Sequence, residues 1–183
     1  MSTPGDSGRD ATRPPTELRS VLAGAQLVGS GTFRFFGISV YEARLWAHGP
    51  FRALDYDRQA FALEIQYERR LTGVAIADRS IAEMQRIGGF TDAQGRLWRK
   101  EMGRAFPDVG AGDRLTGFTD GSGHVQFFCN GMPTAAFNDG HFARLFFGIW
   151  LSEKTTARAL RSELLRGAVG DREGEHDGIL DGQ

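Results

Sequence analysis

The sequence has a single cysteine, Cys129, among its 183 residues. One cysteine excludes an intramolecular disulfide, and it excludes the zinc sites that are built from several cysteines. The four histidines, His48, His124, His141 and His176, show none of the paired spacings that are typical of metal ligands. We therefore predict no metal site and no cofactor, and we expect packing alone to hold the fold.

Long apolar runs are also missing. The longest run, residues 145–151, is far shorter than the ~20 residues that a membrane-spanning helix needs. Residues 1–16 are rich in Ser, Gly, Asp and Pro, and they contain no apolar stretch that resembles the core of a signal peptide. The sequence therefore predicts no membrane span and a cytoplasmic location.

Neither sign of charge is in excess, because the formal net charge is -1 and the isoelectric point is about 6.4. No overall field then favours nucleic acid or an anionic membrane, and partners have to be inferred from local features. Arg96, Lys100 and Arg104 share one face of a predicted helix, but Glu101 interrupts them, as on any solvated helix face. We predict no nucleic-acid partner.

The chain has enough apolar residues for the core of one domain, since 40% of its residues are hydrophobic. The composition of residues 1–22 predicts a disordered N-terminal segment, and that of residues 167–183 predicts a disordered acidic tail. One domain is therefore expected over residues 23–166.

Alternating polarity predicts strands. From residue 61 to 67, apolar side chains occupy every second position, which is the period of a strand with one buried face. The other face of the sheet is then expected to meet water, as in antiparallel sheets. Residues 37–47 are expected to form a neighbouring strand, and residues 113–118 and 124–129 a hairpin around the turn at 120–123.

Capping patterns predict where helices begin. Ser80 with Glu83, and Thr91 with Gln94, have the spacing of a capping box, in which two side chains satisfy the free N–H groups of a first turn. On the second of these helices Trp98 falls on the apolar side and is expected to point inward.

The last part of the chain also reads as helical. Asn138 or Asp139 is expected to cap a helix with a broad apolar stripe, and a final helix is expected to begin near Thr156. Because strands and helices alternate in blocks along the chain, we predict the α+β class.

Five phenylalanines are candidates for lining an apolar pocket: Phe33, Phe35, Phe36, Phe146 and Phe147. Aromatic side chains at such spacings also fill ordinary protein cores. The residues themselves leave both interpretations open.

Several segments, taken in order over residues 27–165, resemble the bacterial branch of the chalcone isomerase-like family. They are residues 37–46 (GISVYEARLW), 80–84 (SIAEM), 106–113 (FPDVGAGD), 142–155 (FARLFFGIWLSEKT) and 160–165 (LRSELL). The resemblance implies an open-faced sandwich, in which helices cover one face of an antiparallel β-sheet and a cleft lies between the two layers. Relatives include plant enzymes that cyclise chalcones to flavanones, non-catalytic members that bind fatty acids, and bacterial members without an assigned activity.

The same resemblance identifies positions where this sequence differs from the enzymes. The family motif Gly-x-Gly-x-Arg supplies a cation for a phenolate or a carboxylate, and Phe33 stands in place of that arginine. The adjacent Arg34 can replace it only through a bulge or a shifted register, because neighbouring side chains on a strand face opposite sides. Phe36 and Phe147 stand where the enzymes carry threonine or a comparable polar group. The helix at residues 91–106 lacks the tyrosine and the asparagine of the enzymes.

These replacements lead us to predict no catalytic residues. The leading hypothesis is a non-catalytic domain that binds a small hydrophobic ligand, such as a fatty acid, with its head near Arg34 or Tyr41. The predicted ligand-binding residues are Phe33, Arg34, Phe36, Tyr41, Trp98 and Phe147. One alternative is an isomerase that acts on a chalcone-like enone, with Arg34 and Tyr41 as displaced replacements. The other is a structural or interaction domain with a filled core. The sequence predicts no particular oligomeric state.

Overall fold

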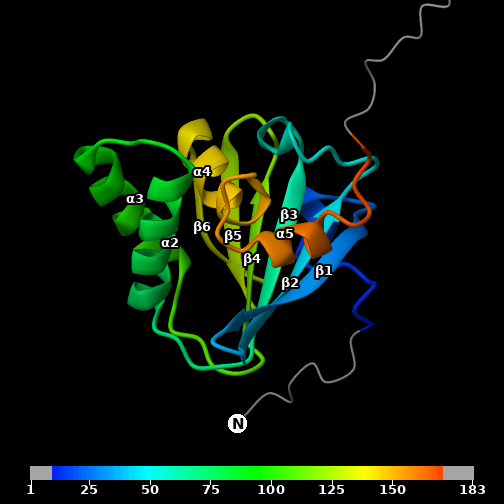
Figure 1. Ribbon diagram of the computed structural model, residues 1–183, viewed down its shortest axis with the longest axis horizontal. Coiled ribbons are helices and arrows are strands. Elements are labelled where there is room, and N and C mark those ends of the chain that lie inside the picture. The colour runs from blue at the N-terminus through cyan, green and yellow to red at the C-terminus, as the bar shows by residue number, and fades with distance from the viewer. Residues whose placement is uncertain (1–9, 171–183) are drawn as a thin grey trace, which may run out of the picture.

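The computed structural model describes residues 10–170, and it shows one antiparallel sheet with helices α2 to α5 packed over one face (Figure 1). The strands lie side by side in sequence order. They are β1 (Gln26–Phe35), β2 (Ile38–Ala47), β3 (Phe61–Tyr67), β4 (Arg114–Thr119), β5 (His124–Cys129) and β6 (Met132–Asn138). The helices are α1 (Leu18–Val21), η1 (Tyr56–Arg58), α2 (Gly73–Ile87), α3 (Asp92–Ala105), α4 (Gly140–Leu151) and α5 (Arg158–Leu164). This arrangement confirms the predicted α+β class with a layer of helices on one face.

Helix α4 lies within the helical layer, where it contacts α2 and α5. It begins after Asp139, whose carboxylate accepts a hydrogen bond from the backbone N–H of Phe142 at 3.0 Å. Its broad apolar stripe faces the core, as the sequence predicts: Leu145 and Leu151 are fully buried, and Ile149 is partly buried. Helix α3 packs against α2 and against strand β6. Within residues 10–170, no helix has the length and apolar character needed to cross a membrane.

Only one of the two predicted capping boxes exists. Thr91 and Gln94 form a complete box at the start of α3, which confirms that prediction. The prediction for Ser80 and Glu83 is wrong, because both lie inside α2, which begins after Thr72. Inside a helix the Ser80 hydroxyl donates to the backbone carbonyl four residues earlier, so the same sequence pattern serves a different structure.

The sheet face opposite the main helices is also covered, which corrects the prediction that it meets water. Glu64 on β3 belongs to this face and is 0% exposed. Its carboxylate accepts hydrogen bonds from Trp46 Nε1 at 3.2 Å and from Arg114 Nη1 at 2.8 Å. Arg114 Nη1 also donates to Glu17 Oε1 at 2.9 Å, and Arg44 Nη1 lies 3.6 Å from Glu64 Oε1. We call Glu17, Arg44, Glu64 and Arg114 the buried ion cluster.

Electrostatics within the buried ion cluster favour the charged state of Arg114. Burial acts to lower the pKa of Arg114, but the carboxylates of Glu17 and Glu64 outweigh burial and raise that pKa. A polar residue on β3 is therefore compatible with complete burial, because its charge is matched on the same face of the sheet. A strand whose polar face is buried shows the same alternating polarity in the sequence as a strand whose polar face meets water.

The cover of this face comes from the N-terminal part of the chain. Leu18 and Leu22 are buried there against Trp46 and Phe128. The sequence predicts disorder for residues 1–22, so the packed domain begins earlier than expected. Residues 1–9 and most of the predicted acidic tail, residues 171–183, lie outside the described residues.

Candidate functional site

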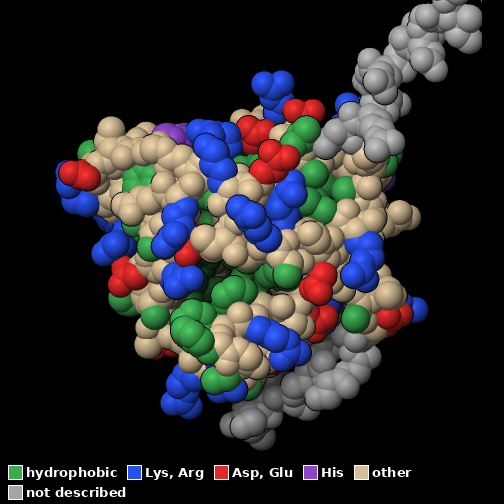
Figure 2. Space-filling view, viewed as in Figure 1, with side chains coloured by type: hydrophobic (Ala, Val, Ile, Leu, Met, Phe, Trp, Pro, Cys, Tyr) green, Lys and Arg blue, Asp and Glu red, His purple; other side chains and the backbone are tan. Residues whose placement is uncertain are grey.

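A cavity of about 290 Å³ lies between the sheet and helices α2 and α4. Its volume is near the lower end of the roughly 300–1,000 Å³ that is usual for small-molecule sites. Figure 2 shows hydrophobic side chains gathered around a hollow on this face. We call this cavity the pocket; its lining includes Phe33, Phe35, Val40, Tyr41, Ile65, Tyr67, Ile76, Arg79, Ser80, Glu83, Phe146, Phe147, Trp150 and Thr156.

The floor of the pocket is a row of aromatic side chains across three strands. Phe33 pairs with Tyr41, and Tyr41 pairs with Tyr67, so all three side chains face the helices. The rings of Phe33 and Tyr41 stack with centroids 5.0 Å apart, and those of Tyr41 and Tyr67 meet edge to face at 5.9 Å. Gly117 lies in the same lining, where an added Cβ would meet the ring of Phe147 at 3.1 Å. The glycine therefore lets the Phe147 ring of α4 pack directly against the sheet.

Two tyrosine hydroxyls bring hydrogen-bond donors into this apolar lining. The Tyr41 hydroxyl accepts a hydrogen bond from Trp150 Nε1 at 2.9 Å, which leaves its own O–H available to donate. The Tyr67 hydroxyl has no hydrogen-bond partner among the described residues, although the backbone N–H of Tyr67 donates to the Asp113 carbonyl at 2.8 Å. Burial raises the pKa of both tyrosines above the usual value. Both hydroxyls are therefore protonated near neutral pH, and both can donate to a carbonyl or carboxyl oxygen.

The mouth of the pocket is charged. Arg79 on α2 has a side chain 60% exposed, and its Nη2 lies 3.1 Å from Glu83 Oε1. Arg86 Nε lies 3.9 Å from the same oxygen, and the Thr156 hydroxyl donates to Glu83 Oε2 at 3.0 Å. Two arginines thus share one carboxylate, and of the two only Arg79 lines the pocket.

Three of the six predicted ligand-binding residues line the pocket. They are Phe33 and Tyr41 on the sheet and Phe147 on α4. Phe33 and Phe147 both border the cavity. A structural domain with a filled core would have no cavity at this place.

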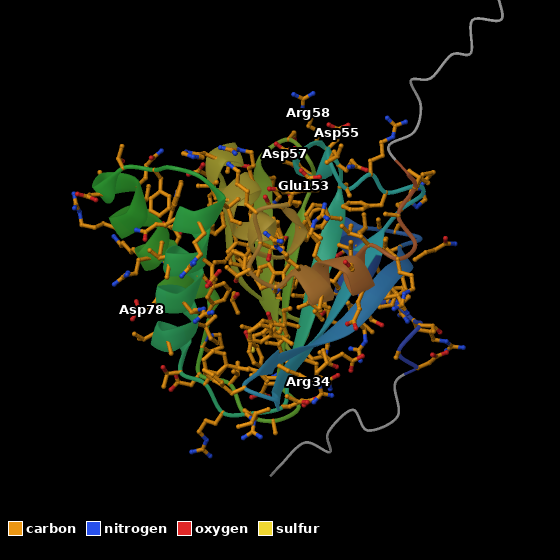
Figure 3. The ribbon with its side chains drawn as sticks, viewed as in Figure 1. Arg34, Asp55, Asp57, Arg58, Asp78 and Glu153 are labelled. Carbon is orange, nitrogen blue, oxygen red and sulfur yellow. The ribbon has the colours of Figure 1, made fainter. Side chains whose placement is uncertain are left out.

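The other three predicted residues do not line the pocket. Arg34 follows a register shift between β1 and β2, but its exposed side chain donates to Ser39 Oγ at 2.7 Å (Figure 3). The bulge that the sequence requires is present, yet it directs the guanidinium away from the cavity. Phe36 lies in the turn between β1 and β2 and faces solvent. Trp98 is buried as expected, but its Nε1 donates to Asp139 Oδ2 at 2.8 Å, between α3 and α4.

Sequence reasoning missed the α2 contribution to the pocket. Ile76, Arg79, Ser80 and Glu83 are spaced three or four residues apart, so they share one face of α2. The predicted helix begins at Ser80, so Ile76 and Arg79 lie outside it. A helix that begins after Thr72 places all four residues on one face.

Comparisons with known proteins agree with this architecture. Residues 15–166 match the chalcone isomerase-like family, and this range begins before the expected domain start at residue 23. Among solved structures, the chain is similar to the fatty-acid binding protein AtFAP1 of Arabidopsis thaliana, with 11% sequence identity and a TM-score of 0.58. The similarity covers 77% of this chain and 86% of AtFAP1, and at this identity it shows the fold alone. No curated protein sequence matches the chain. Because the family match spans most of its length, the chain belongs to the chalcone isomerase-like family.

Proposed function

We propose that the pocket binds one small hydrophobic molecule with a polar end, and that this ligand is a fatty acid. The observation that carries the proposal is a cavity with a largely apolar lining. Its few polar groups lie at the mouth and on the floor. The similarity in fold to a fatty-acid binding protein supports the same ligand class.

In this proposal the carboxylate of the ligand lies at the mouth, near Arg79. A carboxylate buried deeper in the pocket would meet only neutral donors, and burying a charge without a partner is costly. At the mouth, Arg79 can form a charge-assisted hydrogen bond while water still solvates the ligand head. The hydrocarbon tail then extends over Phe33 and Phe147. Arg79 thus takes the role that the sequence gives to Arg34.

The lining supports binding rather than catalysis. Glu83 is the acidic side chain in the lining, and its two oxygens already contact Arg79 and Thr156. A carboxylate held in this way is a poor general base, since an efficient base must be free to take a proton from the substrate. An apolar cavity can hold a ligand, but it accelerates a reaction only if it binds the transition state better than the substrate.

A series of saturated fatty acids tests the proposal. Each added methylene that enters the pocket contributes about 0.8 kcal/mol, so Kd should fall about fourfold per methylene. The gain should stop once the cavity of about 290 Å³ is filled. Isothermal titration calorimetry along the series measures this dependence. Affinities that do not change with chain length, or no binding by any member, would contradict the proposal.

Arg79→Gln tests the position of the head group. We expect affinity for a fatty acid to fall about fivefold, because an exposed arginine contributes up to about 1 kcal/mol to an ion pair. Affinity for the fatty alcohol of the same length should not change, since it carries no charge. Arg86→Gln is the matched control, because Arg86 also faces Glu83 but does not line the pocket. Equal losses in both variants, or equal losses for acid and alcohol, would place the head group elsewhere.

A further inference from the structure

We propose that the turn between β1 and β2 docks the protein on the surface of an anionic lipid membrane. The turn and its flanks, residues 35–38, form what we call the hairpin tip. Phe35 is 51% exposed, Phe36 is 89% exposed and Ile38 is 47% exposed. Single exposed apolar residues are common on protein surfaces, but three within four positions form a contiguous apolar patch. Figure 1 shows this hairpin at the lower edge of the molecule, at one end of the sheet.

The backbone of the hairpin tip disfavours the residue that it carries. Phe36 has φ 49 and Gly37 has φ 76, so both central residues of the two-residue turn lie in the left-handed region. Asparagine is the preferred residue at the first of these positions, and a bulky side chain is unfavourable there. The Phe36 ring packs against the Phe35 ring, with centroids 4.5 Å apart, and not into the core. Fold stability therefore gives no reason for phenylalanine at this position, whereas insertion into an apolar medium does.

Two arginines lie beside the hairpin tip, and we call them the basic collar: Arg34 and Arg69. Arg34 Nη1 donates to Ser39 Oγ at 2.7 Å, and Arg69 Nε donates to the backbone carbonyl of Ser39 at 3.0 Å. Both side chains are thus anchored beside the apolar patch. Among the described residues, no carboxylate forms an ion pair with the basic collar. Its charge is free to attract anionic headgroups.

An apolar tip within a basic collar matches the layers of a membrane surface. Apolar side chains enter the boundary between headgroups and acyl chains, while arginines remain with the phosphates. Each arginine near an anionic surface adds a favourable contribution, and stable attachment requires apolar and electrostatic contacts together. A flat or grooved protein partner would not need cations beside a projecting apolar tip. A membrane is therefore the occupant that fits both features.

The hairpin tip is continuous with the pocket. Phe35 is half exposed at the tip and also lines the pocket, and Val40 follows it on the neighbouring strand. A protein docked through the tip would hold this part of the pocket lining close to the lipid. Docking goes beyond the proposed ligand function and does not depend on it, because the tip and the collar are present with or without a ligand.

Vesicle flotation with the full chain tests the docking proposal. Wild type should float with vesicles of phosphatidylcholine and phosphatidylserine, and much less with phosphatidylcholine alone. Phe36→Asn should weaken binding to the mixed vesicles about tenfold, because it removes the most exposed apolar side chain. Asparagine suits this turn, so the variant should remain folded. Leu54→Asn is the matched control, since Leu54 is an exposed turn residue between β2 and β3, at the other end of the sheet.

The basic collar has its own test in the same assay. Arg69→Gln should weaken binding to the mixed vesicles about fivefold, and added salt should reduce the difference from wild type. Arg58→Gln is the control, because Arg58 lies at the end of the molecule opposite Arg34 (Figure 3). No binding of wild type to the mixed vesicles, or equal binding of wild type and Phe36→Asn, would overturn the proposal. Self-association that Phe36→Asn abolishes, without vesicle binding, would overturn it in favour of a second copy of the chain.

The two proposals fail separately. Phe36→Asn should bind a fatty acid in calorimetry as well as wild type does, because Phe36 does not line the pocket. Loss of vesicle binding with normal fatty-acid binding therefore assigns the defect to the hairpin tip alone. Vesicle binding by a protein that takes up no fatty acid would sustain docking and reject the ligand.

Discussion

Ile76→Trp is expected to weaken fatty-acid binding about 100-fold. Ile76 lines the pocket from α2 and is only partly buried, so an indole at this position can turn into the cavity without breaking the core. It would occupy space that several methylenes of the ligand need, and each lost methylene costs about 0.8 kcal/mol. Loss of three or four methylenes gives the expected change in Kd. Calorimetric titration with a saturated fatty acid measures it.

Val74→Trp is the matched control for this experiment. Val74 lies on the same helix and is exposed, and it does not line the pocket, so tryptophan there should leave Kd unchanged. Thermal unfolding of both variants shows whether each remains folded. A folded Ile76→Trp protein that binds as tightly as wild type would exclude the pocket as the binding site.

Glu64→Ala is expected to lower the free energy of unfolding by about 3–5 kcal/mol. The substitution leaves Trp46 Nε1 without its acceptor and removes one of the two carboxylates bound to Arg114. Breaking a buried ion pair by removing one partner is costly, because the remaining charge stays away from water. Denaturant unfolding followed by tryptophan fluorescence measures the change.

Glu153→Ala is the control for Glu64→Ala, because Glu153 is an exposed carboxylate that forms no ion pair with any described residue (Figure 3). Its loss should change the free energy of unfolding by less than about 0.5 kcal/mol. A similarly small effect for Glu64→Ala would mean that the buried ion cluster does not hold the N-terminal residues against the sheet.

The features that could be predicted from the sequence depend on residues close together along the chain. The apolar stripe of α4 repeats within one helix, and the capping box of Thr91 and Gln94 spans one turn. The hairpin around residues 120–123 likewise depends on local turn chemistry. Each of these local patterns predicts a structure that forms at the predicted residues.

The features that could not be predicted depend on contacts between distant residues. Glu64 looks solvent-facing in its own strand, and only the return of Glu17 and Arg114 to the same face explains its burial. The side-chain direction of Arg34 depends on where the register between β1 and β2 shifts, which no short motif specifies. Arg79 reaches the pocket because α2 packs beside α4, and that contact joins residues far apart in the sequence.

Native mass spectrometry of the full chain, stripped of lipid and then mixed with a saturated fatty acid, tests the central claim most directly. Wild type should carry one fatty acid per chain, because the pocket is a single cavity of limited volume. The Ile76→Trp protein should remain unbound under the same conditions, and the Val74→Trp protein should bind as wild type does. No bound fatty acid in wild type, or the same amount in wild type and Ile76→Trp, would contradict the claim that this pocket is a fatty-acid site.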